Sequence, residues 1–346
     1  MKRHKIPLIA LGMTIAGISS SCVHEFPEAG ESAEVRLTLV HNTEWTEYDY
    51  VYNRRDGNTR GDETPTFVRY VIKAYRHGAK SGPEYEFTVT SDDLSLAPYR
   101  TSIRLPEGEW DLYVWQDLTT GGNVFYDATD FGRISYTGAY TGHTDLRDTF
   151  EGHAGVEVTA SYNAGHYVDA TIQLERPMAK YVFIAKDFRK FYDETLLPAL
   201  AAQNGVKSDP DRRWTTLSAQ EQTDALKGWS VTAYYPLFMP SVYDTLSRKV
   251  RDSSKGMKYS ATITPISDDE AILAFDYVLM NPDPGGAQVQ LVLHTPTGTD
   301  VTMTPLVSVP LKRACITYVR GNFLTTGTQG GLDIDFSFSG DINIEI

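Results

Sequence analysis

The chain has 346 residues, of which 41% are hydrophobic and 22% are charged, a composition typical of globular domains. It excludes a collagen-like or wholly disordered protein. Lys and Arg number 32 against 45 Asp and Glu, so the formal net charge is −13. Because a surface this acidic repels a phosphate backbone, we expect no nucleic-acid partner.

The first residues have the layout of a secretory signal. Three cations precede an apolar stretch at 6–18, and three serines then lead to Cys22. We therefore assign residues 1–21 to a signal peptide. The apolar stretch is shorter than the roughly 20 residues that cross a bilayer, and no later segment approaches that length, so we expect no transmembrane helix.

Cys22 closes a run of small residues that resembles the lipobox of bacterial lipoproteins, although Ser19 stands where that motif usually has Leu. The resemblance implies that Cys22 becomes the N-terminus and carries acyl chains such as palmitate, which would hold the protein at a membrane surface. The alternative is simple cleavage beside an incidental cysteine. In either case residues 22–34, which include Glu25, Glu28 and Glu31, are expected to form an acidic tether.

Alternation of apolar and polar residues with period two dominates the rest of the chain and predicts half-buried strands of antiparallel sheets. The clearest runs are Val35–Leu39, Val68–Ile72, Tyr85–Val89, Trp110–Val114, Val168–Leu174, Val289–Leu293 and Leu332–Phe338. Short helices are predicted only at 193–203 and 218–227, the second with Ser218 as N-cap and Glu221 three residues on. The expected fold is all-β with minor α content, in two β-sandwich domains at 35–176 and 177–346.

No catalytic motif stands out, so we expect neither an enzyme nor a cofactor. The densest polar group could in principle gather a divalent cation, although its spacing matches no metal template and loops are commonly polar for solvation. It comprises His143, Asp145, Asp148, Glu151 and His153.

Aromatic residues crowd around 110–126. Trp110 and Trp115 are five residues apart and should face opposite sides of a strand. Core packing explains most of these side chains, but an exposed Tyr113 or Trp115 could stack on a sugar ring. A surface glycan-binding lipoprotein is therefore the alternative function.

A polar stretch of about 24 residues separates the first predicted strand from the second, longer than ordinary connections, and it contains Arg54, Arg55 and Arg60. Exposed polar loops are preferred sites of proteolysis. A cut after one of these arginines would separate only the first strand from the rest of the protein. That strand could then dissociate and expose a groove with an apolar floor.

The chain ends in two further alternating runs. Their apolar residues are Leu332, Ile334, Phe336 and Phe338, followed by Ile342, Ile344 and Ile346. Such a tail could act as a donor strand on another subunit, with backbone hydrogen bonds giving affinity and alternate side chains giving specificity. Donor and acceptor surfaces differ, so the contact would be head-to-tail. The alternative is that the tail pairs within its own domain.

Several stretches together resemble the fimbrillin-like lipoproteins of type V pili: CVHEFPE at 22–28, LPEGEWDLYVW at 105–115, LERPMAKY at 174–181, VPLKR at 309–313 and RGNFLT at 320–325. The resemblance implies two transthyretin-like sandwiches and export as a lipoprotein to the outer membrane. In polymerising members it also implies removal of the first strand by an arginine-specific protease, followed by strand exchange. Other pilus subunits, the outer membrane and a host or glycan ligand would be the partners, and anchor, stalk and tip roles all stay open.

Overall fold

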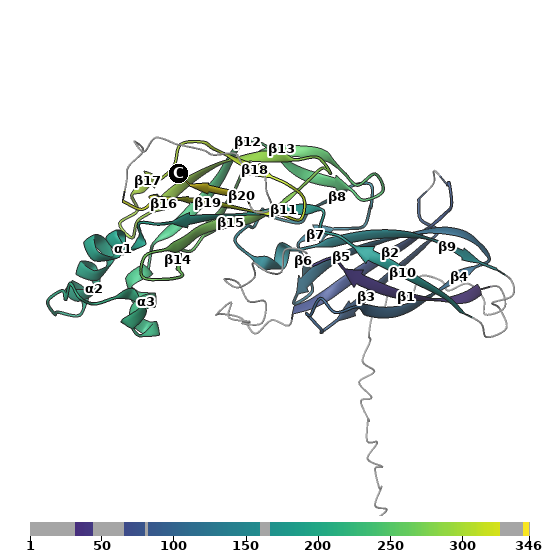
Figure 1. The fold of residues 1–346 in the computed structure, drawn as a ribbon, viewed down its shortest axis with the longest axis horizontal. Coiled ribbons are helices and arrows are strands. Elements are labelled where there is room, and N and C mark those ends of the chain that lie inside the picture. The colour runs from purple at the N-terminus through teal and green to yellow at the C-terminus, as the bar shows by residue number, and fades with distance from the viewer. Residues whose placement is uncertain (1–31, 44–65, 80–81, 160–166, 326–341, 346) are drawn as a thin grey trace, which may run out of the picture.

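A computed structural model describes residues 32–43, 66–79, 82–159, 167–325 and 342–345 (Figure 1). Strands take up 55% of the described residues and helices 11%, which confirms the predicted all-β class with minor helix. Within the ranges described, no helix combines the length and apolar character needed to cross a membrane.

The first half of the chain forms two sheets that enclose one hydrophobic core. One sheet has the order β10-β1-β4, from β1 (Ser32–His41), β4 (Tyr99–Pro106) and β10 (Tyr167–Leu174). The other contains β2 (Thr66–Arg76), β3 (Tyr85–Ser91), β5 (Gly108–Thr120), β6 (Asn123–Val124) and β9 (Phe150–Val158). The alternating runs predicted here all fall within these strands.

The second half of the chain forms two larger sheets around a second core. One has the order β14-β15-β11-β19-β20, from β11 (Met178–Ala185), β14 (Thr264–Pro265), β15 (Ala271–Leu279), β19 (Ile316–Gly321) and β20 (Ile342–Glu345). The other contains β7 (Tyr126–Asp127), β8 (Ile134–Tyr136), β12 (Ser230–Asp244), β13 (Lys249–Ala261), β16 (Gly285–His294), β17 (Asp300–Thr302) and β18 (Val307–Leu311).

Most strand pairs are antiparallel, as predicted, but three pairs are parallel: β1 with β10, β11 with β19, and β19 with β20. β7 and β8 precede residue 176 yet join the second half, because β8 pairs with β12. The division at 176/177 remains our proposal for the domain boundary.

A third core joins the two halves. Every residue of β11 and β15 is buried, because these strands are covered on both faces. Along β11, Tyr181 and Phe183 pack into the core of the second half, whereas Val182 and Ile184 pack into a cluster that also holds Val71. Trp115 and Phe131 lie in that same cluster, so the first half supplies part of it.

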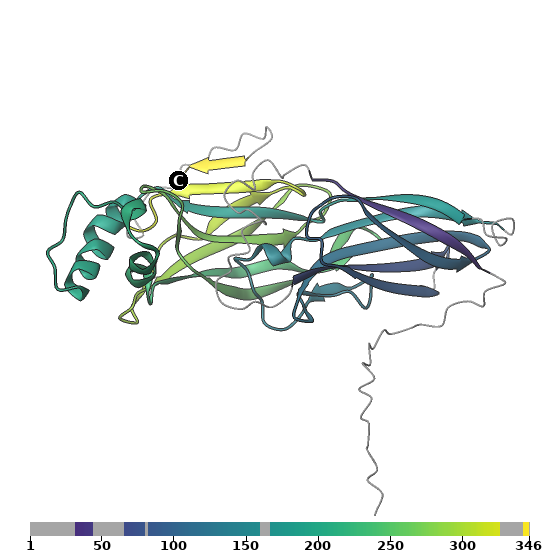
Figure 2. The ribbon, with the colours of Figure 1, turned by 90° about the horizontal axis from the view of Figure 1, so that it is seen from below.

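The helices lie at the far end of the second half, away from β1 (Figures 1 and 2). The first begins earlier than predicted: α1 (Phe188–Phe191) continues through a π-helical turn (Tyr192–Leu196) into α2 (Leu197–Gln203). Two short 3₁₀ turns occur at Asp145–Arg147 and Trp214–Thr216. The N-terminus of α3 (Ala219–Leu226) confirms the predicted capping box, since Ser218 and Glu221 each accept the other's backbone N–H.

Candidate functional site

β1 occupies the middle of its sheet. Val35 stands opposite Val168 of β10 in parallel register and opposite Ile103 of β4 in antiparallel register, so β1 is hydrogen-bonded along both edges. Its alternate side chains, which are at most 1% exposed, point into the core of the first half: Ala33, Val35, Leu37 and Leu39.

This burial decides what a cut in the following loop would do. A fully buried Val or Leu side chain contributes roughly 1.5–3 kcal/mol, so the three larger side chains of β1 together contribute on the order of 5–9 kcal/mol. Cutting the chain removes none of these contacts. A cleaved β1 would therefore stay bound until another strand took its position, and cleavage alone would not open the groove that the sequence suggested.

Several predicted site residues lie outside the described residues, and their roles stay predictions. They are Cys22, Arg54, Arg55, Arg60, Leu332, Ile334, Phe336, Phe338 and Ile346. Ile342 and Ile344 belong to β20, of which the structure describes the backbone.

β20 pairs in parallel with β19, with Thr317 opposite Ile342 and Arg320 opposite Glu345. It lies at the edge of its sheet (Figure 2). The end of the chain thus pairs with its own half of the molecule, over four residues. To reach a neighbouring subunit, β20 would first have to leave β19.

Asp187 fixes the chain just before this tail begins. Its carboxylate accepts hydrogen bonds from three consecutive backbone N–H groups, those of Phe323, Leu324 and Thr325, at 2.7–3.2 Å, and from the Thr325 hydroxyl at 2.8 Å. Asp187 stands at the N-cap position of α1 but makes no side-chain bond to that helix. The carboxylate instead holds residues 323–325, the last described residues before 342.

The polar group proposed as a cation site is divided among separate contacts. Asp145 accepts from Lys180 at 2.8 Å, Asp148 pairs with Arg176 at 2.9 Å, and His153 stacks on Tyr113. In the described part of the chain, no three His, Cys, Asp or Glu side chains are placed to share a metal ion. The acidic members instead bind basic side chains from distant parts of the sequence.

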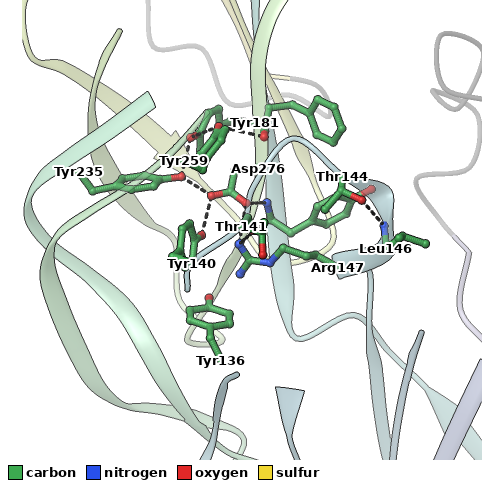
Figure 3. Close-up of polar contacts among 12 residues, drawn as sticks. Tyr136, Tyr140, Thr141, Thr144, Leu146, Arg147, Tyr181, Tyr235, Tyr259 and Asp276 are labelled. Atoms are coloured by element: carbon green, nitrogen blue, oxygen red, sulfur yellow. Dashed lines mark hydrogen bonds and ion pairs between the residues drawn. The ribbon is translucent and has the colours of Figure 1, made fainter. Parts of the chain in front are cut away.

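A buried polar cluster lies where the segment after β8 meets β15 (Figure 3). Arg147 donates from Nη1 to Oδ1 of Asp276 at 3.0 Å, and the hydroxyls of Tyr140 and Tyr235 donate to Oδ2 at 2.6 and 2.5 Å. Tyr181 links Tyr235 to Tyr259 through hydroxyl contacts of 2.5 and 3.0 Å.

Desolvation dominates the electrostatics of this cluster. Burial raises the pKa of Asp276 although Arg147 acts in the opposite direction, and burial raises the pKa of Tyr235 well above its usual value. Shifted pKa values often mark catalytic sites. Here Asp276 is fully buried and its two oxygens are occupied by the side chains that enclose it. The arrangement suits cohesion between the two halves better than access for a substrate.

A second cluster reinforces the same junction. Glu151 is 1% exposed, and its Oε1 accepts from the Tyr243 hydroxyl at 2.6 Å and from Arg248 at 3.1 Å. Arg313 donates to the Tyr243 hydroxyl at 2.8 Å. Sequence reasoning missed both clusters. For the first cluster the available signal was Asp276, an acid within the otherwise apolar run AILAFDYVL at 271–279, which requires buried partners.

Trp115 cannot serve as the glycan platform that the sequence suggested. It faces the opposite side of β5 from Trp110, as predicted, but both indoles are fully buried, in different cores. The Trp115 indole N–H donates to Asp117 at 3.1 Å, and its ring packs against Tyr126. Tyr113 is half-buried and is already stacked on His153. The junction between the halves, unrecognised from sequence, accounts for the burial of Trp115.

Comparison with known proteins identifies the family. Residues 28–346 match the model of a family of unknown function (DUF6562), and the chain belongs to that family. No curated protein sequence matches it.

Several solved structures have a similar arrangement. A candidate polysaccharide-binding protein from Bacteroides thetaiotaomicron is 11% identical, with 79% of this chain and 80% of that chain covered and a TM-score of 0.40. The fimbrial anchor protein Mfa2 from Porphyromonas gingivalis is 12% identical, with 78% and 80% covered and a TM-score of 0.37. A candidate adhesin from Bacteroides ovatus is 9% identical, with 93% and 96% covered and a TM-score of 0.40.

Proposed function

We propose that this chain is a non-catalytic pilus protein, either a fibre subunit or an accessory or anchor protein, that assembles by head-to-tail β-strand addition. The observation that carries the proposal is the position of β1. It is the first strand that the structure describes, it fills the middle of a sheet, and its covalent connection to the later strands runs only through residues 42–65.

One cut within 44–65 would free β1 covalently while leaving its neighbours in place. β10 and β4 would keep their connections to the body of the protein, since both strands lie later in the chain. Between them they present hydrogen-bonding edges and the apolar positions now filled by Ala33, Val35, Leu37 and Leu39. A strand from another subunit with apolar residues at every second position would satisfy both requirements.

The tail of the chain has the pattern of a donor. Leu332, Ile334, Phe336 and Phe338 repeat the spacing of the four buried residues of β1. The four-residue pairing of β20 with β19 is the contact that donation would break. A parallel pairing this short at a sheet edge is weak compared with the pairing of β1, which has eight paired positions with each of its two neighbours.

Export as a lipoprotein completes the proposal. Acyl chains on Cys22 would hold the molecule at the outer membrane. The tether predicted at 22–34 would be shorter and end at residue 31, because β1 already begins at Ser32. Retention of β1 and its lipid would suit an anchor, whereas loss of both after cleavage would suit a fibre subunit.

The test is controlled cleavage of the mature chain, residues 22–346, with an arginine-specific protease, followed by light scattering. We expect cleavage within 44–65 and then formation of multimers, slowly with this chain alone and faster with added pilus subunits. A variant in which Arg54, Arg55 and Arg60 are all replaced by Gln should stay monomeric, and a chain ending at residue 331 should be cleaved but not assemble. If the cleaved wild-type chain stays monomeric with and without added pilus subunits, strand addition is wrong.

A further inference from the structure

We infer that the position of β1 is selective for a strand from a different protein, one that carries a basic residue at the place of Arg36 and an acidic or polar residue at the place of Glu34. This inference rests on the proposed function. It concerns the outer row of β1, which alternates with the buried row and so can distinguish strands that share the same apolar pattern.

The outward-facing residues of β1 lie opposite charged residues on both neighbouring strands. In the observed register, Arg36 stands opposite Asp169 of β10 and Ser102 of β4. Two residues earlier, Glu34 stands opposite Arg104 of β4. Cross-strand neighbours of opposite charge stabilise a sheet and like charges destabilise it. The two flanking strands thus favour an anion at the place of Glu34 and a cation at the place of Arg36.

Arg36 itself makes two favourable contacts there. Its guanidinium lies 3.3 Å from the centre of the Tyr167 ring, and its Nε donates to Glu34 at 3.2 Å. Glu34, Tyr167 and Asp169 all act to raise the pKa of Arg36. Tyr167 is 43% exposed even with Arg36 over its ring, so this cation–π contact lies at the surface.

The chain's own tail does not supply that cation. Residues 332–346, LDIDFSFSGDINIEI, contain no Lys, Arg or His. Aligning Leu332 with Ala33 in the direction of β1 puts Asp335 at the place of Arg36, opposite Asp169. Every other register leaves the place of Arg36 without a positive charge. Its own tail fits the apolar row but not the outer row, which favours a heterologous donor over a second copy of this chain.

The experiment uses the mature chain with the recognition sequence of a site-specific protease in place of part of 44–65. After a single cut at this sequence, it measures the exchange of β1 for added peptides. Fluorescently labelled β1 is displaced by three synthetic peptides: residues 32–41, the same peptide with Arg36→Glu, and residues 332–346. We expect the unchanged peptide to compete about tenfold better than the Arg36→Glu peptide, the combined effect of one cation–π contact and one cross-strand charge pair. The tail peptide should also be weaker than the unchanged peptide.

A charge exchange on the protein supplies the matched control. With Asp169→Lys in the cleaved chain, the Arg36→Glu peptide should become the better competitor. Equal competition by the two peptides on both proteins, or a tail peptide that competes best, would overturn the inference while leaving strand addition intact. Failure of every peptide to displace β1 would overturn the proposed function itself.

The uncut chain gives an independent reading. Arg36→Glu should lower the melting temperature, and adding Asp169→Lys should restore part of the loss. An Arg36→Glu chain as stable as the wild type would show that the outer row does not select charge, whatever the exchange experiment finds.

Discussion

Arg147 and Asp276 form a buried ion pair, 3.0 Å from Nη1 to Oδ1, between residues on opposite sides of the proposed domain boundary. Their side chains are 2% and 0% exposed. The pair sits among tyrosine hydroxyls that occupy the other carboxylate oxygen of Asp276. Because a buried charge needs its partner, this contact ties the two halves of the molecule to one another.

Removing the carboxylate should therefore be strongly destabilising. Asp276→Ala leaves Arg147 as an uncompensated buried cation, which typically lowers the free energy of unfolding by about 3–5 kcal/mol. Urea unfolding followed by tryptophan fluorescence measures the loss. The matched control is Asp193→Ala, which breaks the more exposed pair with Arg189 and should lower it by at most about 0.5 kcal/mol. Equal losses in both variants would contradict the structural role of the pair.

Acid should weaken the same junction through His143. Burial, with Lys180 as a smaller cause and Asp145 in opposition, lowers the pKa of His143 to about 4. Between pH 6.5 and pH 4 the unfolded chain binds a proton that the folded chain does not, so stability falls as the pH falls, by up to about 3 kcal/mol. Below pH 4 this contribution stays constant.

The control for this effect keeps the backbone unchanged. His143 has a φ of 56°, which Asn tolerates well, so His143→Asn removes the titrating ring without adding strain. Urea unfolding at pH 7.0, 5.5 and 4.5 should show a shallower pH dependence in this variant. An unchanged slope would mean that other groups carry the acid sensitivity.

Asp187 should control the base of the tail. Asp187→Ala leaves three backbone N–H groups without their acceptor, so amide hydrogen exchange at 323–325 should accelerate at least tenfold, with a smaller acceleration at 342–345. In Asp187→Asn, which keeps one carbonyl oxygen, the exchange rates should lie between those of the wild type and those of Asp187→Ala. Unchanged exchange at 323–325 would show that the carboxylate does not hold this segment.

The buried row of β1 should matter far more than the outer row for stability. Leu37→Ala removes a side chain that is 1% exposed and should lower the free energy of unfolding by about 2–5 kcal/mol. Thr38→Ala, one residue on and on the outer face, should change it by less than about 0.5 kcal/mol. Similar effects of the two substitutions in thermal unfolding would mean that β1 is not packed as described.

Local pattern predicted the parts of the fold that depend on local physics. Alternating runs such as Val68–Ile72 and Val289–Leu293 are strands because a half-buried sheet requires that period. The capping box of Ser218 and Glu221 formed because it needs only three residues of separation. The parallel pairs, such as β1 with β10, carry no signal of this kind, since their partners are far apart in sequence.

The buried polar contacts between the two halves could not be predicted either, because their partners are also far apart in the sequence. Asp145, Asp148 and Glu151 resemble an ordinary solvated loop, and nothing near them in sequence indicates Lys180, Arg176 or Arg313 as partners. The expectation that Trp110 and Trp115 face opposite sides of β5 was right, but period two cannot tell that both faces are covered. Burial of the second face comes from the other half of the molecule.

The most direct test of the account is the intact mass of the protein recovered from assembled surface material, with tandem mass spectrometry of any bound fragments. For a fibre subunit we predict a chain that begins between residues 55 and 61, no associated peptide from 32–41, and a strand of another pilus protein cross-linked to β4 or β10. Assembled material in which every chain still holds its own β1 between these two strands would contradict strand exchange at this position.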